Sequence, residues 1–267
     1  MSLEGAVGEF GVIIPARFAS TRLPGKPLID LGGKPMIVRV MEVAAQAGAA
    51  FAMVATDDQR IVDAVTAAGG EAMITSDEHE TGTDRLAEVA RRLRLDPDLI
   101  VVNLQGDEPA LPAELVRRVA ETLRNDPEAS LATLATPLRD RREVFDPNIV
   151  KVVTDQASRA LYFSRAPIPW LRGEFAGGLA AARAQEGAPR LPEDTFLRHV
   201  GLYAYRVSTL LTLSQTRPTP LELAESLEQL RALWLGMKIQ VAVVPELPTA
   251  GVDTAEDAAR VQKLFET

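Results

Sequence analysis

Residues 11–56 read GVIIPARFASTRLPGKPLIDLGGKPMIVRVMEVAAQAGAAFAMVAT, and this stretch sets the expected architecture. It opens on the apolar run GVII and crosses a loop rich in proline and glycine. It then reaches residues 35–48, where apolar side chains recur with helical spacing. It ends on FAMVAT at residues 51–56, a continuous apolar run typical of a strand covered on both faces. A strand, a helix and a second strand in this order predict a βαβ unit.

The alternation of strands and helices continues as far as residue 105. We expect further elements over residues 57–70 (helix), 71–75 (strand), 83–93 (helix) and 99–105 (strand). This rhythm predicts a mostly parallel sheet, and in such sheets ligands bind beyond the carboxyl ends of the strands. Polar loops that each follow a strand should therefore meet at that edge: residues 15–27, 56–58 and 106–109.

The pattern changes in the second part of the chain. Residues 148–155 and 160–170 flank the turn QASR and predict a β-hairpin, whereas residues 171–194, rich in glycine, alanine and proline, predict a loop. Later elements are expected at residues 197–206 (strand), 220–236 (helix), 238–244 (strand) and 251–265 (a terminal helix capped by Asp253 or Thr254).

The composition is that of an ordinary globular protein, with 267 residues, 46% of them apolar and 25% charged. We expect no membrane span, because no apolar run approaches the roughly 18 residues that one needs. The chain has no cysteine, which excludes disulfides, thiolate zinc sites and thiol nucleophiles. Together with the lack of a visible secretory signal, this points to the cytoplasm. The net charge of −8 argues against non-specific nucleic-acid binding.

Three cations lie in the loop that follows the first strand: Arg17, Arg22 and Lys26. Prolines stiffen this loop, and the glycine before the lysine allows a ligand to approach the backbone closely. The loop is not a Walker A motif, because Ser20 and Pro27 stand where that motif needs glycine and Ser or Thr. A solvated basic loop is the plain alternative. The position of the cations after the first strand of an acidic chain favours phosphate binding.

Two aspartates, Asp107 and Asp253, are candidate ligands for a hard cation that carries phosphates. Asp107 directly follows the most apolar strand, and its alternative role is to close a turn. Asp253 precedes the terminal helix, and its alternative role is helix capping. Other chemistries lack their residues: two histidines are too few for a multi-histidine metal site, and neither a dinucleotide fingerprint nor a nucleophile elbow is present.

Eight segments carry a further signal through their order and spacing. They are IPARFASTRLPGKPL (14–28), VATDD (54–58), TGTDR (81–85), VNLQGDEP (102–109), ALYFSRAPIPW (160–170), RHVGLYAYR (198–206), LEQLR (227–231) and GVDTAED (251–257). Together they resemble the 3-deoxy-manno-octulosonate cytidylyltransferase family, the CMP-Kdo synthetases. The resemblance covers nearly the whole chain, from Gly11 to about Phe265.

This resemblance implies an α/β protein with a Rossmann-like nucleotidyltransferase fold, a mostly parallel central sheet and a smaller hairpin-containing subdomain. It implies one domain over residues 11–267. Within it, a nucleotide-binding half would cover about 11–145, a sugar-binding and dimerisation part about 146–250, and a terminal helix at 251–267 would return to the core. The implied reaction joins CTP and Kdo into CMP-Kdo and pyrophosphate for lipopolysaccharide biosynthesis, with Mg²⁺ as cofactor, in a cytoplasmic homodimer. We expect the dimer contact within residues 150–205, because a hairpin with an apolar face needs a partner surface.

The resemblance also implies the residues of the site. Catalysis would rest on Lys26, Asp107 and Asp253, the two aspartates holding the metal. CTP would contact Pro15, Ala16, Arg17, Ser20, Thr21, Arg22, Lys26, Thr81, Gly82 and Gln105. The sugar acid would contact Arg85, Gln105, Arg165, His199, Tyr203, Glu228 and Gln229.

Several of these side chains have an ordinary alternative role. Arg165 can pair with a surface carboxylate, and Glu228 and Gln229 can be solvated positions of a helix. His199 lies within a strand, where a core histidine is the reading that the sequence favours without the resemblance. Tyr203 alternates with apolar neighbours and can belong to the core.

Competing functions stay open at this point. The first is a nucleotidyltransferase for a related sugar, such as 8-amino-Kdo, a sialic-type acid or a sugar 1-phosphate. The second is a non-catalytic nucleotide-binding protein, against which Lys26, Asp107 and Asp253 argue. A nucleic-acid-binding module is disfavoured by the negative charge and by the lack of a basic helix with aromatic neighbours.

Overall fold

The computed structural model describes residues 10–19, 23–175, 191–192, 195–246 and 251–266. The chain divides into two compact units. Unit 1 comprises residues 1–125, 202–216 and 248–267, and unit 2 comprises residues 126–201 and 217–247. The chain therefore leaves unit 1 after residue 125 and returns to it twice, the second time with the terminal segment.

Unit 1 is built around a mostly parallel sheet. Its strands run in the order β3 (Glu71–Ile74), β2 (Phe51–Thr56), β1 (Gly11–Ala16), β4 (Ile100–Asn103) and the second half of β8 (Leu197–Arg206). Its helices are η1 (Lys26–Leu28), α1 (Met36–Gln46), α2 (Gln59–Ala67), α3 (Gly82–Arg92), α4 (Ala113–Arg124), α7 (Val207–Gln215) and α10 (Ala255–Gln262). Among these strands, only β8 runs antiparallel to its neighbour. It pairs with β4, and Tyr203 of β8 lies opposite Asn103 of β4.

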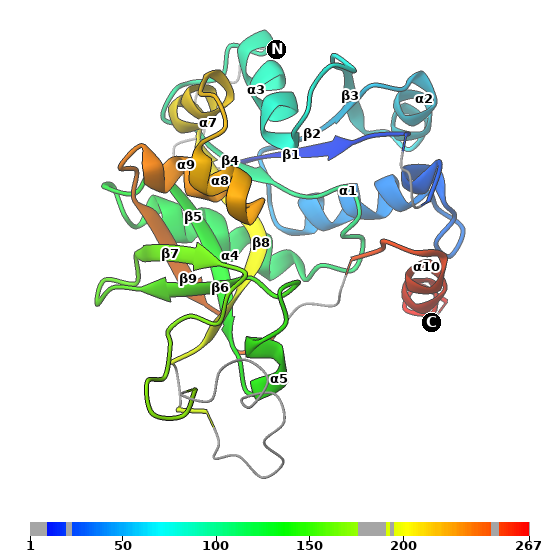
Figure 1. Ribbon diagram of the computed structural model, residues 1–267. Coiled ribbons are helices and arrows are strands. Elements are labelled where there is room, and N and C mark those ends of the chain that lie inside the picture. Colours follow the sequence, from blue (N-terminus) through cyan, green and yellow to red (C-terminus); the bar gives the residue numbers. More distant parts are fainter. Residues whose placement is uncertain (1–9, 20–22, 176–190, 193–194, 247–250, 267) are drawn as a thin grey trace. The chain divides into compact units, whose positions relative to one another are not determined.

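Helices cover both faces of this sheet. Helix α1 packs with α4, and α3 packs with α7; Figure 1 shows α3 above β1 and β2, and α1 below them. This double cover explains why β1 and the first three residues of β4 are apolar, since residues on both faces are withdrawn from water. The expected βαβ rhythm up to residue 105 is confirmed.

The terminal helix is anchored to the segment that leads into α1. Val252, Ala258 and Val261 form a buried cluster with Leu31 and Met36. Figure 1 shows α10 (red) beside the blue turn that precedes α1. A capping box starts α10: the Thr254 hydroxyl accepts from the backbone N–H of Asp257, and the Asp257 side chain accepts from that of Thr254. Of the two expected caps, Thr254 is therefore the one used, and the Asp253 side chain is left for another role.

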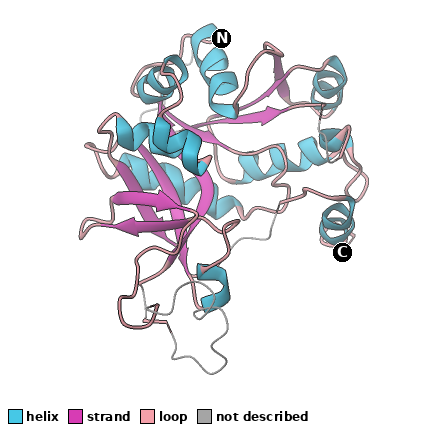
Figure 2. Cartoon of the chain, viewed as in Figure 1, coloured by secondary structure: helices cyan, strands magenta, loops and turns pink. Residues whose placement is uncertain are grey.

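Unit 2 holds the remaining elements. They are β5 (Leu131–Pro137), α5 (Arg141–Val144), β6 (Lys151–Thr154), β7 (Ala160–Ser164), the first half of β8, α8 (Pro220–Glu225), α9 (Gln229–Trp234) and β9 (Ile239–Val243). The predicted hairpin is confirmed, because β6 and β7 pair antiparallel (Figure 2), and β5 pairs with β9 in parallel. Aromatic rings fill part of this unit's core: Phe145, Phe175 and Phe196 pack with Leu138 and Val144.

The prediction of one helix over residues 220–236 is wrong. The chain forms the two short helices α8 and α9 instead, separated at Ser226, whose φ of 52° is left-handed. A left-handed residue cannot continue an α-helix, and the apolar spacing alone does not reveal it. Helix α4 and strand β5 were not anticipated. Part of the expected loop 171–194, namely residues 176–190 and 193–194, lies outside the described residues. None of the described helices is long and apolar enough to cross a membrane.

Candidate active site

A cavity of about 390 Å³ opens at the carboxyl edge of the unit 1 sheet. The register places the ends of the strands side by side there, with Ala16 of β1 opposite Thr56 of β2 and Ile13 opposite Asn103 of β4. The cavity is lined by Pro15, Ala16, Arg17, Ala19, Lys26, Pro27, Met36, Gly82, Arg85, Gln105, Gly106, Asp107 and Asp253. The predicted convergence of separate loops on one edge is confirmed for the loops after β1 and β4.

Lys26 occupies a stiff position in this cavity. Gly25 before it has a φ of 70°, which suits glycine, and Lys26 itself begins the single turn η1, with Pro27 as the second residue of that turn. The N–H of Leu28 donates to the carbonyl of Gly25 at 2.8 Å, and that of Ile29 donates to Lys26 at 3.2 Å. The backbone under Lys26 is thus held in place, while its four-carbon side chain remains the adjustable part.

The Lys26 ammonium lies between two carboxylates. Its Nζ is 2.8 Å from Oδ2 of Asp107 and 3.1 Å from Oδ1 of Asp253. The lysine side chain is 12% exposed, whereas the aspartate side chains are 36% and 53% exposed. The two predicted metal ligands, which are far apart in sequence, are thereby brought to one cation.

Backbone contacts explain why the two aspartates meet. The N–H of Val252 donates to the carbonyl of Asp107 at 2.8 Å, so the segment before α10 is joined directly to the loop after β4. Gly251 fits tightly in this contact, because a Cβ there would lie 2.9 Å from Oε1 of Glu108 and 3.0 Å from the carbonyl oxygen of Asp107. The position of Asp253 therefore requires a residue without a Cβ at position 251.

Replacing Gly251 by Ala should lower turnover about 10- to 100-fold, since displacing catalytic groups by about 1 Å has effects of that size. Gly201→Ala is the matched control, because a Cβ at residue 201 meets no atom within 4 Å and its φ is not positive. Steady-state kinetics and thermal melting of both variants are the measurements. Normal turnover in a folded Gly251→Ala variant would show that the contact does not position Asp253.

Glu108 is a site residue that the sequence analysis missed. Burial, followed by the negative charge of Asp107, raises the pKa of Glu108 to about 7. Its carboxyl group therefore lies close to the carboxylates of Asp107 and Asp253. The residue stands inside the quoted segment VNLQGDEP, but nothing in a single sequence distinguishes a partly buried glutamate from a solvated one.

Arg85, on α3, lines the same cavity as Lys26. It is fully buried, and its guanidinium donates to Oδ2 of Asp57 at 3.2 Å and to the hydroxyl of Thr75. Its Nε has no hydrogen-bond partner among the described residues. A buried donor in a cavity wall is costly unless a ligand or water accepts from it. The Nε–H of Arg85 is thus a buried donor that the described residues do not satisfy.

The other predicted site residues of unit 1 lie in different surroundings. Arg17 lines the cavity and donates to the carbonyl of His79. Thr81 caps α3, and its hydroxyl is bonded to Asp84. The Tyr203 ring lies beside Tyr205, with 5.8 Å between centroids. Three predicted CTP ligands lie outside the described residues: Ser20, Thr21 and Arg22.

In unit 2, Arg165 is held by backbone carbonyls. Its guanidinium donates to the backbone carbonyl of Glu225 at 2.7 Å and to that of Pro147 at 2.9 Å. The buried Lys151 ammonium donates in turn to the carbonyl of Arg165 at 2.7 Å, and burial lowers the pKa of Lys151 to about 8. Among the residues that the structure describes, the Arg165 guanidinium does not form the surface ion pair that the sequence offered as an alternative.

His199 is a partly buried histidine of unit 2. Its Nε2 lies 3.0 Å from Oγ1 of Thr133, and its ring meets the ring of Phe163 edge-on. Burial lowers the pKa of His199 to about 3, so the imidazole is neutral in the folded protein. Glu228 precedes α9 and Gln229 begins it, and Gln229 Nε2 is buried without a partner among the described residues.

The neutral state of His199 predicts a specific acid sensitivity. The folded-state pKa of about 3 lies below the ordinary 6.5, so the unfolded chain binds the proton more readily between these values. Stability should therefore be fully present above about pH 6.5 and fall as the pH drops towards 3, by up to about 1.4 kcal/mol per pH unit for one proton. In a His199→Gln variant, the free energy of unfolding measured in urea should change less steeply with pH between pH 4 and 7. The same pH dependence in the variant and the wild type would contradict a neutral His199 in the folded protein.

The comparisons with known proteins agree with this geometry. A family model described as cytidylyltransferase matches residues 11–239. The 3-deoxy-manno-octulosonate cytidylyltransferase of Photorhabdus laumondii is 54% identical over 256 residues, covering 96% of this chain and 98% of the relative. The enzyme of the same name from Photobacterium profundum is 52% identical, with coverages of 96% and 99%.

Solved structures add the fold. A CMP:2-keto-3-deoxy-manno-octonic acid synthetase complexed with CTP aligns with a TM-score of 0.83 and 42% identity, covering 96% of this chain and 98% of that one. The 4-diphosphocytidyl-2C-methyl-D-erythritol synthase of Anaerococcus prevotii aligns with a TM-score of 0.59 at 14% identity, covering 97% and 100%, and supports the fold alone. The chain therefore belongs to the cytidylyltransferase family, among the 3-deoxy-manno-octulosonate cytidylyltransferases.

Proposed function

We propose that this protein transfers the cytidylyl group of CTP to 3-deoxy-D-manno-octulosonate (Kdo), giving CMP-Kdo and pyrophosphate for lipopolysaccharide biosynthesis. The observation that carries this proposal is the cavity at the sheet edge, where Lys26 meets Asp107 and Asp253. The relatives at 52–54% identity supply the substrate, since their names specify 3-deoxy-manno-octulosonate.

The chemistry requires positioning and charge neutralisation. The C2 hydroxyl oxygen of Kdo attacks the α-phosphorus of CTP and releases its proton to solvent. The bond between the α-phosphorus and the oxygen shared with the β-phosphate breaks, and pyrophosphate leaves with that oxygen. Both reactants are anionic, so cationic groups around the phosphates lower the barrier. Lys26 and Arg17 line the cavity on the loop after β1 and are assigned to the β- and γ-phosphates. No enzyme nucleophile is needed for this in-line displacement.

The donor set of the cavity fits Mg²⁺. Two carboxylates from separate segments converge on one cation position, and Mg²⁺ in such enzymes is commonly held by one or two carboxylates plus substrate phosphates and water. Among the described residues no cluster of three or more acidic or histidine side chains forms a metal cage. When bound, the ion supplies Lewis-acid polarisation of the α-phosphate. Asp107 and Asp253 are the residues assigned to hold it.

The sugar acid is assigned by resemblance to Arg85, Gln105 and Tyr203 of unit 1 and to Arg165, His199, Glu228 and Gln229 of unit 2. Within unit 1, Arg85 Nε is a buried donor without a partner among the described residues, and within unit 2 the same holds for Gln229 Nε2. Each taken by itself is suited to an acceptor of a polyhydroxylated acid. Thr81, Gly82 and Gln105 remain assigned to CTP on the same grounds.

The assignment of residues to substrates predicts a separation of kinetic constants. Arg165→Ala should raise the KM for the sugar acid more than the KM for CTP, because Arg165 is assigned to the sugar carboxylate. Its loss should cost about 1.5–3 kcal/mol of charge-assisted hydrogen bonding, or roughly 10- to 100-fold in that KM. A rise in the KM for CTP with the sugar KM unchanged would reverse the assignment.

The substrate is tested by pyrophosphate release from CTP with Kdo, 8-amino-Kdo and N-acetylneuraminate in parallel. We expect turnover with Kdo and little with the other two acids, and we expect CTP to be preferred over UTP, ATP and GTP. An Asp107→Asn preparation controls for contaminating enzymes. Faster turnover with another acid would change the substrate, and CTP binding without turnover on any of them would favour a non-catalytic nucleotide-binding protein.

The proposal includes a cytoplasmic homodimer. On the predicted dimer region, β7 carries Leu161 with 61% of its surface exposed, a large apolar side chain without cover in one chain. Light scattering at micromolar concentration tests the assembly, and a monomer would overturn it.

A further inference from the structure

Lys26 makes contacts that a role in phosphate binding alone does not explain. Its ammonium makes hydrogen bonds of 2.8 Å and 3.1 Å to the carboxylates of Asp107 and Asp253. An ammonium has three N–H donors, and two of them are spent on these oxygens. The same group therefore cannot bind the nucleotide fully while it remains on both carboxylates.

We propose that Lys26 is a resident counter-cation of the Asp107–Asp253 pair, which a divalent cation must displace, and that displacement frees the ammonium for the phosphates of the nucleotide. This inference rests on the proposed function, because it assumes that the same cavity takes CTP and a divalent cation. The Lys26 ammonium would thus occupy two positions in succession, first on the carboxylates of Asp107 and Asp253 and then on the phosphates of the nucleotide.

The local structure suits such a movement. The backbone of Lys26 is held by η1 and by Gly25, whose N–H donates to the carbonyl of Phe18 at 3.2 Å. A lysine side chain is a compact charge on a flexible stem, so it can exchange partners without a backbone shift. The two carboxylates lie on segments joined by the Val252 to Asp107 hydrogen bond and should stay together when the ammonium leaves.

The proposal has a consequence that distinguishes it from a phosphate-only role. A cation that competes with Lys26 binds more weakly than the carboxylates alone would allow, so removing the lysine charge should tighten metal binding in the absence of nucleotide. If Lys26 contacted only phosphates, metal binding without nucleotide would not change.

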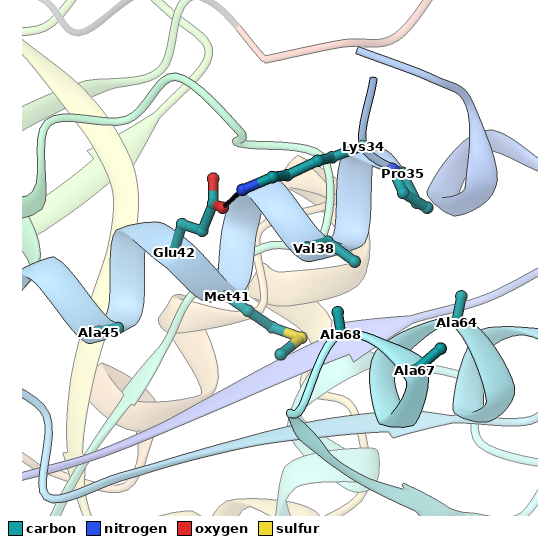
Figure 3. Close-up of a pocket in the computed structure, with 9 residues that line it drawn as sticks. All are labelled: Lys34, Pro35, Val38, Met41, Glu42, Ala45, Ala64, Ala67 and Ala68. Atoms are coloured by element: carbon teal, nitrogen blue, oxygen red, sulfur yellow. Dashed lines mark hydrogen bonds and ion pairs between the residues drawn. The ribbon is translucent and has the colours of Figure 1, made fainter. Parts of the chain in front are cut away.

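Lys34 is the matched control for this comparison. It lies in unit 1 and also forms an ion pair, with Glu42 of α1, at the rim of a separate cavity of about 570 Å³ over α1 and α2 (Figure 3). That cavity is lined mainly by alanine and other apolar side chains, and Lys34 is no part of the candidate active site. Lys34→Met therefore removes one positive charge from the same unit without touching Asp107 or Asp253.

The experiment titrates the nucleotide-free full-length chain with Mn²⁺, a spectroscopic substitute for Mg²⁺, and measures free Mn²⁺ by electron paramagnetic resonance. We expect Lys26→Met to lower the Kd for Mn²⁺ at least about tenfold, the size of one charge-assisted contact. Lys34→Met should match the wild type, and Asp107→Asn should weaken binding. An equal or higher Kd in Lys26→Met than in the wild type would overturn the proposal.

Two further measurements keep the result unambiguous. Lys26→Gln, which is neutral but keeps an N–H donor, replaces Lys26→Met if circular dichroism shows that the methionine variant is unfolded, and the same tightening is expected. Wild-type turnover with CTP and Kdo is measured on the same preparation. If the wild type turns over CTP and Kdo but the Lys26 variants do not bind Mn²⁺ more tightly, this inference alone is overturned. A wild type without turnover would instead count against the proposed function.

Discussion

Replacing either Asp107 or Asp253 by Asn should lower turnover on the order of 10²–10³-fold, the effect of removing one preorganised electrostatic contact from a transition state. The physical reason is their shared position: both carboxylates contact the same ammonium and are assigned to the same metal ion. The Asp107→Asn/Asp253→Asn double variant should be little worse than the single variants, because losing either ligand already dismantles the site.

The measurements are turnover, its dependence on magnesium concentration, and the melting temperature of each variant. Asp63→Asn is the matched control, because Asp63 lies exposed on α2 of the same unit and is bonded to Gln59. Near-normal turnover in either single variant, or multiplicative effects in the double variant, would contradict a shared metal. Loss of activity that follows the melting temperature would reduce both residues to structural roles.

The largest effect on stability is expected from the buried ion pair of unit 2. Arg231 and Glu222 form a two-pronged contact in which Nε lies 2.9 Å from Oε2 and Nη2 also meets Oε1, with side chains 4% and 10% exposed. The Glu222 carboxylate also accepts from the backbone N–H of Thr219, which starts α8. This contact joins α8 to α9. Arg231→Met should therefore destabilise unit 2 by about 3–5 kcal/mol, because it leaves a buried carboxylate without its counter-charge.

The chain is well suited to this measurement. Both tryptophans, Trp170 and Trp234, belong to unit 2, so tryptophan fluorescence in urea reports its unfolding. Arg142→Met is the control, since Arg142 forms a 2.6 Å ion pair with Asp140 but is 85% exposed, and its loss should leave the urea midpoint unchanged. Glu222→Met combined with Arg231→Met should recover much of the loss, because no unpaired charge remains. A midpoint for Arg231→Met equal to that of Arg142→Met would show that burial does not strengthen this pair.

Local patterns in the sequence were sufficient for most of the fold. The apolar runs that became β1, β2 and β4, and the helical spacing of α1, α2 and α3, depend on which faces are buried, which repeats along a short stretch of chain. The hairpin of β6 and β7 was predictable for the same reason. The family segments then indicated the chemistry, because residues such as Lys26 and Asp107 stand at fixed distances from recognisable strands.

Tertiary structure alone decided which side chains meet. Lys26 contacts Asp107 and Asp253, which are 81 and 227 residues away, and only the folded sheet edge brings these three charges together. Local periodicity is equally silent about the left-handed Ser226 that divides α8 from α9. The physical reason is that secondary structure follows from neighbouring residues, whereas burial, pairing and the pKa of a group such as Glu108 follow from atoms contributed by distant segments.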